Sequence, residues 1–210
     1  MISLPLRSTV SRTAAACVAA TAWAGLIVQC VVLYSQNSSV LLTLWVVLGF
    51  FTITTNLLVA VVFTGMAANR TMFGKDWVVA GTMLSILLVG VIYVLLLHGL
   101  TELSGASVVA NVLLHLVTPV LVPLFWIFFA RNGGLSWWHP LLWSIYPLAY
   151  LVYALARGSA TGKYAYPFMN VLVLGWAQTT FNALCIAVAF MLSGFAIVWI
   201  DFRARSRSAA

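Results

Sequence analysis

Charged side chains are scarce in this sequence, and acidic ones are almost absent. Asp, Glu, Lys and Arg make up 6% of the 210 residues, only three residues are acidic, and 64% of the chain is hydrophobic, with a mean hydropathy of +1.10. A soluble domain needs roughly 25% charged residues to cover its surface, so this composition excludes one. We therefore predict a single all-α domain over residues 1–210, a polytopic membrane protein whose partners are membrane lipids.

Cysteine is scarce as well. Cys17, Cys30 and Cys185 are odd in number and lie inside apolar runs, which excludes a disulfide framework and a metal cluster of recognisable spacing. The net charge of +7 does not indicate a nucleic-acid partner, because nearly all ten basic residues flank apolar runs, where such residues orient membrane helices. We predict no metal, no cofactor and no nucleic-acid partner.

Apolar runs long enough to cross a bilayer core of roughly 30 Å recur along the whole chain. The first run resembles a signal peptide that ends at Ala22-Trp23-Ala24, but it continues to Tyr34 and is long enough to stay in the membrane as an anchor. The sequence predicts six transmembrane helices, at about residues 14–34, 40–67, 77–97, 108–129, 138–156 and 172–200.

The basic residues predict how these helices are oriented. Six spans place both termini on one side of the membrane, and loops on the cytoplasmic side carry an excess of Lys and Arg. Only Arg157 and Lys163 lie in the opposite loops. The other eight lie in the termini and in the loops after the second and fourth spans: Arg7, Arg12, Arg70, Lys75, Arg131, Arg203, Arg205 and Arg207. Both termini are therefore predicted to be cytoplasmic, in a cell membrane.

The fourth predicted span carries the only intramembrane base. Asn111, His115 and Thr118 lie at i, i+4 and i+7, so they share one helix face. Hydrocarbon does not solvate polar groups, and ionisable residues inside a membrane are costly and mark functional sites. This face is predicted to look into the protein.

The second predicted span carries a matching polar face made of Thr52, Thr55 and Asn56. With the predicted orientation, Thr52 and His115 lie within roughly 8 Å of each other in depth at 1.5 Å per residue. The two faces are expected to meet in the outer half of the bilayer. In the last span, Gln178 and Asn182 form a third polar stripe that could close the same cavity. The residues predicted to line this cavity are Thr55, Thr118, Gln178 and Asn182.

Four short motifs occur in a fixed order relative to the predicted spans. They are Phe51-Thr52 with Asn56-Leu57-Leu58, Lys75-Asp76-Trp77, Asn111-x-x-x-His115, and Thr161-Gly162 with Tyr166-Pro167-Phe168. In these motifs, over most of its length, the chain resembles the androgen-induced and androgen-dependent TFPI-regulating membrane proteins of vertebrates and their bacterial relatives. Vertebrate members are threonine hydrolases that cleave fatty acid esters of hydroxy fatty acids within the membrane.

The resemblance implies a catalytic role for two residues. Carried over to this sequence, the catalytic histidine is His115 and the nucleophilic threonine is Thr52, with a lipid ester as substrate. The chain departs from the family in having Val112 where vertebrate members have a second histidine. The spacing after the threonine differs as well. The next polar residue of the family pattern lies four positions after the threonine in this chain and three positions after it in vertebrate members. Thr54 and Thr55 stay alternative nucleophiles.

The chemistry of such a pair is simple. A threonine hydroxyl is a poor nucleophile until a base accepts its proton, and neutral His115 is the base available. The oxyanion needs hydrogen-bond donors, and Asn56 and Asn111 are the candidates for that role or for orienting the pair. No carboxylate lies at the right depth, so a dyad is expected instead of a triad.

A non-catalytic function is the alternative. A small transporter or a solute- or lipid-binding membrane protein could use the same polar cavity to bind a solute or to relay a proton. Such a protein often has an internal repeat, and the two halves of this chain show no convincing one.

Overall fold

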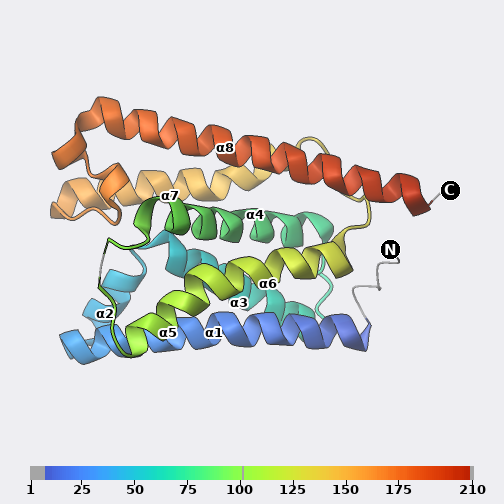
Figure 1. The fold of residues 1–210 in the computed structure, drawn as a ribbon, viewed down its shortest axis with the longest axis horizontal. Helices are drawn as coiled ribbons and strands as arrows, with labels where there is room; N and C mark the ends of the chain where they lie inside the picture. The colour runs from blue at the N-terminus through green and yellow to red at the C-terminus, as the bar shows by residue number, and fades with distance from the viewer. Residues whose placement is uncertain (1–7, 101, 209–210) are drawn as a thin grey trace.

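The computed structural model describes residues 8–100 and 102–208, with side chains up to residue 204, and most of these residues are helical. No strand occurs within those ranges, so the all-α prediction is confirmed for them. The α-helices are α1 (Thr9–Asn37), α2 (Val40–Val47), α3 (Phe51–Ala67), α4 (Asp76–Ile92), α5 (Ala106–Val112), α6 (Thr118–Phe125), α7 (His139–Thr161) and α8 (Val171–Ser208) (Figure 1). The π-helical turns η1 (Tyr93–Leu97), η2 (Leu113–Val117) and η3 (Trp126–Ala130) extend α4, join α5 to α6, and extend α6, and a 3₁₀ turn, η4 (Pro167–Met169), precedes α8.

Local sequence sets several of the helix ends. The side chain of Ser8 accepts a hydrogen bond from the Ser11 amide at the start of α1, and that of Ser39 accepts one from the Leu42 amide at the start of α2. Gly162 caps the carboxyl end of α7 and takes the left-handed conformation (φ 70°) that glycine adopts without strain.

Several helices are long and apolar enough to cross a membrane. Among the described residues these are Thr9–Asn37, Asp76–Leu97, Ala106–Ala130 and Val171–Ala204, and the α2–α3 pair makes a fifth if its bent halves are counted as one span. The prediction of a protein with several membrane-spanning helices is confirmed at this level. The predicted fifth span corresponds to α7, which is not among these helices, so the count of six and the cytoplasmic termini stay predictions. Arg7 and the side chains of Arg205 and Arg207, used to predict the orientation, lie outside the described part.

The second predicted span is not one continuous helix. α2 and α3 are bent by 94° at the break between them. The polypeptide leaves helical geometry around Gly49, whose carbonyl oxygen accepts a hydrogen bond from the Tyr150 hydroxyl (2.8 Å), and Arg157 donates one to the carbonyl of Trp45 (2.6 Å). The prediction of an uninterrupted helix over 40–67 is wrong because these contacts with α7 stabilise the bend. Thr52 is consequently the second residue of α3 and not a residue deep in a long helix.

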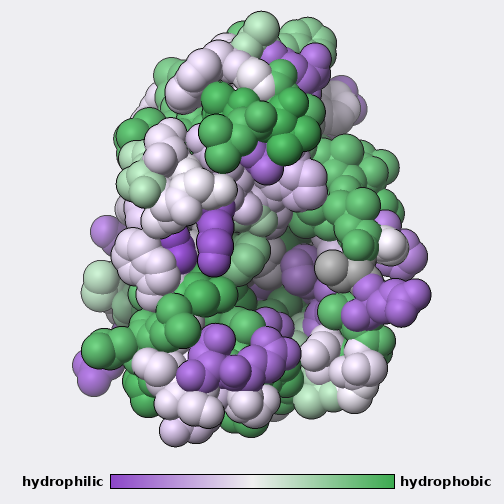
Figure 2. Space-filling view, turned by 90° about the vertical axis from the view of Figure 1, so that its left-hand side faces the viewer, coloured by the Kyte–Doolittle hydropathy of each residue, from purple (hydrophilic) through white to green (hydrophobic). Residues whose placement is uncertain are grey.

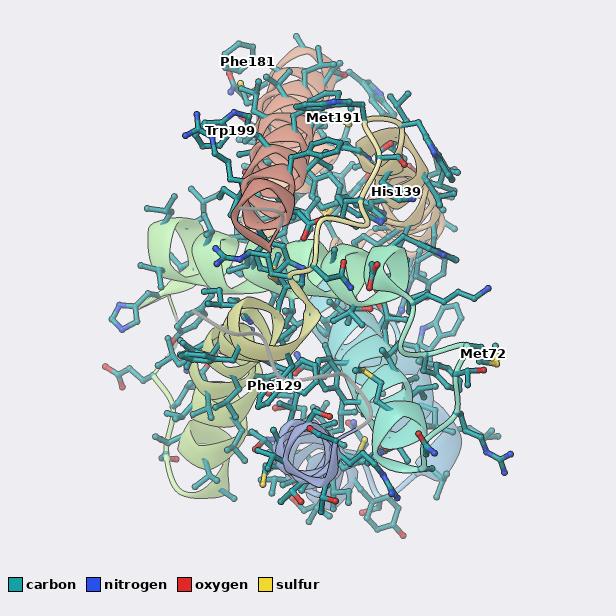
Figure 3. All side chains as sticks on the ribbon, turned by 90° about the vertical axis from the view of Figure 1, so that its right-hand side faces the viewer. Met72, Phe129, His139, Phe181, Met191 and Trp199 are labelled. Atoms are coloured by element: carbon teal, nitrogen blue, oxygen red, sulfur yellow. The ribbon has the colours of Figure 1, made fainter. Side chains whose placement is uncertain are left out.

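The helices pack in layers on either side of α4. In the 18-residue apolar window of α4, 56% of the residues are buried, compared with 22% in α8, so α4 is central and α8 peripheral. Figure 3 shows α7 and α8 on one side of α4 and α1, α3 and α6 on the other. Side chains such as Phe181 and Trp199 point outward from α8, with 61% and 50% of their surface exposed. An apolar outer surface of this kind is what a lipid environment requires.

The end of the molecule that holds α2 and the α7–α8 connection is chemically mixed. Figure 2 looks onto this end and shows hydrophilic side chains gathered between hydrophobic patches. Such a mixture is typical of the place where membrane helices emerge into the interfacial region. The amino end of α3 begins on this side of the molecule, which decides where the candidate site lies.

Candidate active site

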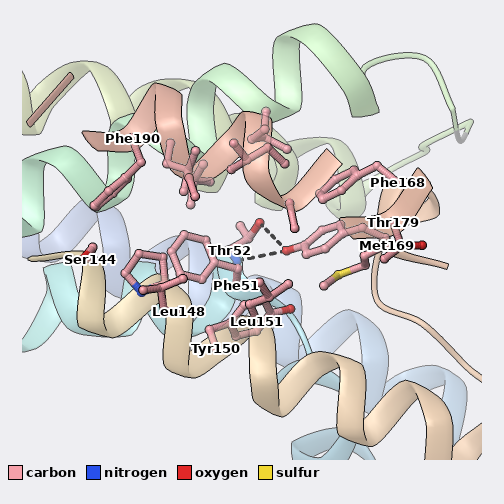
Figure 4. Close-up of a pocket in the computed structure, with 18 of the residues that line it drawn as sticks. Phe51, Thr52, Ser144, Leu148, Tyr150, Leu151, Phe168, Met169, Thr179 and Phe190 are labelled. Atoms are coloured by element: carbon pink, nitrogen blue, oxygen red, sulfur yellow. Dashed lines mark hydrogen bonds between the residues drawn. The ribbon is translucent and has the colours of Figure 1, made fainter. Parts of the chain in front are cut away.

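Thr52 lies at the amino end of α3, directly after the bend. Its side chain is buried, with 6% of the residue exposed. The residue before the helix, Phe50, is extended and caps no amide with its side chain. The Thr52 N–H instead donates to the hydroxyl of Tyr166 at 3.3 Å (Figure 4). Helix amino termini carry partial positive charge, so negative charge that forms next to Thr52 is stabilised there.

The structure brings Thr52 and His115 together. Thr52 Oγ1 lies 3.2 Å from His115 Nε2, and His115 Nδ1 lies 3.2 Å from the backbone carbonyl oxygen of Asn111. A carbonyl oxygen only accepts hydrogen bonds, so Nδ1 carries the proton and donates it to Asn111. Nε2 then has a free lone pair, which accepts the Thr52 hydroxyl proton. The Asn111 carbonyl thereby sets the tautomer that a base needs.

A π-helical turn positions His115. Within η2 the Thr118 amide bonds to the carbonyl of Leu113, five residues earlier, and the next residue, Pro119, has no N–H. The carbonyl of Leu114 therefore loses its partner within the helix. Asn56 supplies a replacement, since its side-chain amide donates to the Leu114 carbonyl at 3.1 Å as well as to the Thr52 carbonyl at 2.8 Å.

The two asparagines predicted to act as oxyanion donors or to orient the pair both lie beside it. The Asn56 amide group uses its N–H donors on two carbonyls and thereby ties α3 to η2. The Asn111 amide donates to the hydroxyl of Tyr93 at 2.6 Å, while its backbone carbonyl holds His115. This geometry favours the orienting role for both residues over the donation of a hydrogen bond to an oxyanion.

Two tyrosines complete the surroundings of the pair, and sequence reasoning assigned neither of them a role at the site. The ring of Tyr93 lies against that of His115, with 4.5 Å between the ring centroids. The Tyr166 hydroxyl lies 3.5 Å from Thr52 Oγ1. Tyr166 belongs to the motif Tyr166-Pro167-Phe168, which was the one sequence signal that pointed to it.

The alternative nucleophiles face another partner. The hydroxyls of Thr54 and Thr55 lie 2.9 and 3.0 Å from the hydroxyl of Tyr146 on α7, and Thr54 also donates to the carbonyl of Phe51. Neither hydroxyl is within hydrogen-bonding distance of His115, whose Nε2 is bonded to Thr52. Of the three threonines considered, the geometry favours Thr52.

Next to Thr52 a pocket with a volume of about 170 Å³ opens between α4, α7 and α8 (Figure 4). The loop that carries Tyr166 covers one end of it. Its wall is mainly aliphatic and aromatic, and the polar members of the wall are Thr52, Ser144, Tyr150, Tyr166 and Thr179. A mostly apolar pocket with a few convergent polar groups is the usual form of a small-molecule site.

The residues predicted to line the cavity are not part of this wall. Thr55 bonds to Tyr146, and the Thr118 hydroxyl donates to its own helix at 2.8 Å. Gln178 is exposed and donates to Asn182, which in turn donates to the Phe168 carbonyl at 2.9 Å. Each of these side chains finds a polar partner locally, and none of them lines this pocket.

A different face of α8 points into the pocket. Gly175, at φ 73°, breaks helical geometry near the start of α8. The pocket-facing residues of α8 are Thr179, Ala183, Ile186, Ala187, Phe190 and Met191. The polar stripe that contains Gln178 therefore lies beside the pocket and not in it.

Two of the three acidic residues, Asp76 and Asp201, have their hydrogen-bond partners in another part of the fold. Asp76 accepts a hydrogen bond from Asn132, and Asp201 accepts the backbone amides of Gly133 and Leu135, so both hold the loop that follows η3. Among the described residues, no group of three or more His, Cys, Asp or Glu could hold a metal ion. Comparisons with protein-family models, curated proteins and solved structures gave no match to this chain.

Proposed function

We propose that this protein is a membrane-embedded hydrolase that cleaves a lipid ester, with Thr52 as nucleophile and His115 as base. It would then be a bacterial relative of the androgen-induced membrane protein family that it resembles. The observation that carries the proposal is the 3.2 Å contact between Thr52 Oγ1 and His115 Nε2, with Nδ1 held by the Asn111 carbonyl. A nucleophile bonded to a base that a third group orients is the signature of covalent hydrolysis.

In the first step, Nε2 of His115 takes the hydroxyl proton of Thr52 while Oγ1 attacks the carbonyl carbon of the ester. A positioned base contributes about 10² to 10⁴ in rate. The carbonyl oxygen becomes an oxyanion. His115 then gives its proton to the leaving alkoxide, and the acyl group stays on Thr52.

Tyr166 is the proposed oxyanion donor. Its hydroxyl oxygen accepts the Thr52 N–H, which leaves the hydroxyl proton free to donate to a second acceptor. The carbonyl oxygen of an ester attacked by Oγ1 would lie within reach of this hydroxyl, which is 3.5 Å from Oγ1. The amino terminus of α3 adds favourable partial charge at the same place.

Water completes the cycle. His115 again acts as base and removes a proton from a water molecule, which attacks the acyl-threonine and releases the acid. In this dyad the backbone carbonyl of Asn111 takes the place of the carboxylate of a catalytic triad. The carbonyl fixes the His115 ring for its role as base without adding a buried charge.

We further propose that α7 is a sixth span and that both termini are cytoplasmic, in the plasma membrane. The positions of the basic residues support this orientation. It places the start of α3, and with it Thr52, toward the outer side, where water for the second step enters.

A fluorophosphonate probe tests the proposal without knowledge of the substrate. The probe reacts with a hydroxyl that its surroundings make nucleophilic, so threonines bonded only to their own helix stay unlabelled. We expect labelling at Thr52, its loss in Thr52→Ala, its retention in Thr52→Ser and a reduction of about 10² or more in His115→Ala. Thr54→Ala is the matched control and should label like the wild type.

The opposite result would favour the non-catalytic function. If folded wild-type protein takes up no probe under conditions that label a control hydrolase, the hydrolase proposal fails. A solute-binding or proton-relay role for the polar groups around His115 then becomes the better explanation.

A further inference from the structure

The pocket beside Thr52 is elongated along α8. Its wall on α8 runs from Thr179 to Met191, which corresponds to roughly 18 Å along the helix axis at 1.5 Å per residue. One leaflet of a bilayer core is about 15 Å thick. The pocket therefore has the length of a membrane acyl chain and runs parallel to the helices, as such chains do.

The inner end of the pocket is closed by close helix packing. At Gly194, one turn beyond Met191, a Cβ atom would lie 3.0 Å from Pro140 of α7 and 3.3 Å from Leu84 of α4. The three helices thus converge directly below the pocket, and no chain can pass between them. Figure 4 shows Ser144 and Phe190 at this inner end and Thr52 partway along the pocket.

Small side chains create the space above this closed end. Ala183 and Ala187 lie one turn apart on the pocket face of α8, where a larger residue would fill the gap between α7 and α8. Leu148, on the α7 wall, is 47% exposed, so the pocket reaches the lipid-facing surface there. A lipid can enter the pocket through such an opening without crossing water.

The position of His115 decides which part of an ester occupies the pocket. The leaving alkoxide must face Nε2 of His115, which donates the proton, and His115 is not part of the pocket wall. The other substituent of the reacting carbonyl carbon is the acyl chain. It is directed away from His115, on the side of Thr52 where the pocket lies.

We propose that this pocket holds the acyl chain of the substrate and that its closed inner end limits the length of that chain, with Ala187 as the residue that leaves the inner part open. The inference rests on the proposed hydrolase function. Each methylene buried in an apolar site strengthens binding by roughly fourfold. The reaction rate should therefore rise with chain length until the inner end is filled, and then stop rising.

The first test compares ethyl, octyl and hexadecyl fluorophosphonates on the purified full-length protein. The wild type should label faster with octyl than with ethyl probe. Ala187→Phe should lower the octyl-to-ethyl ratio by about tenfold or more, since two or more buried methylenes lose their site. Ala189→Phe, at an exposed position on the other face of α8, is the matched control and should keep the wild-type ratio. If Ala187→Phe does not fold, Ala187→Leu should shift the ratio in the same direction.

An unchanged ratio in a folded Ala187→Phe protein would overturn the inference while the hydrolase function stood. A second experiment does not depend on the nucleophile. A fatty acid with a diazirine at its terminal carbon is photo-crosslinked to the Thr52→Ala protein. We expect crosslinks on the peptide that contains Phe190 and Met191, and their loss when Ala187→Phe is added. Crosslinks spread over the exposed residues of α8 would overturn the acyl-chain pocket. Failure of every fluorophosphonate to label the wild type would instead count against the hydrolase.

Discussion

Around Thr52, hydrogen-bond geometry distinguishes side chains that hold the fold in place from one that can take part in the reaction. Asn56 and Asn111 satisfy carbonyl and hydroxyl groups and hold α3, η2 and Tyr93 in place. Tyr166 is different, because its hydroxyl accepts the Thr52 amide and keeps a proton to donate. A phenol at this position can act on the reaction itself and not only on the fold.

Replacing Tyr166 by phenylalanine tests this role. Tyr166→Phe removes the hydroxyl and keeps the ring, which lies 5.2 Å from that of Phe168. We expect kcat for a fatty acyl ester to fall by about 10² to 10³ with little change in KM, as for the loss of one oxyanion donor. Tyr164→Phe, on the same loop and bonded only to Ser159, should leave kcat unchanged. A rise in KM alone would show that Tyr166 binds substrate and does not stabilise the oxyanion.

The helices themselves carry irregularities that serve the candidate site. The bend between α2 and α3 puts Thr52 at a helix amino terminus, and the π turn η2 frees the carbonyl that Asn56 binds. Both depend on residues with special backbone or steric properties, Gly49 and Pro119. Irregular turns of this kind inside membrane helices are tolerated where neighbouring helices supply the missing hydrogen bonds.

Gly49→Ala is predicted to disturb the bend. A methyl group at position 49 would overlap the Arg157 guanidinium group, which donates to Trp45 on the far side of the bend. The flexible Arg157 side chain can move aside, so we expect a loss of only about 1 kcal/mol in stability, the contribution of its hydrogen bond to the Trp45 carbonyl, and a lower hydrolysis rate if Thr52 shifts from His115. Gly74→Ala is the control, since its nearest neighbour would be 3.9 Å away. Thermal unfolding and ester turnover measure the two effects, and equal values for both variants would show that the bend does not need Gly49.

For the molecule as a whole, orientation in the membrane decides from which side water reaches Thr52. A reporter fused after Ala210 should read cytoplasmic, and one inserted near Ser104 should read external, because the basic residues favour this arrangement. The carboxyl-terminal fusion is also the control that shows that a protein carrying a reporter inserts into the membrane. An external carboxyl terminus would mean that one span was miscounted, and the outer location of the site would be lost with it.

Composition and periodicity alone were enough to class this chain as a membrane protein with several spanning helices, and to select His115 as its one intramembrane base. These properties are local: hydropathy follows from the residues themselves, and a shared helix face follows from spacing. The neighbouring Asn111 and Asn56 were selected on the same grounds, and both lie beside the pair.

Three-dimensional packing was needed for the rest. The choice of Thr52 over Thr54 and Thr55, the approach of Tyr166 and the pocket wall made by α8 all depend on how helices are bent and rotated against one another. The rotation of α8 turns the face that carries Thr179 and Ala183 toward the pocket, and not the polar stripe that contains Gln178. Periodicity within one helix contains no information about that rotation, because it is set by contacts between residues far apart in the chain.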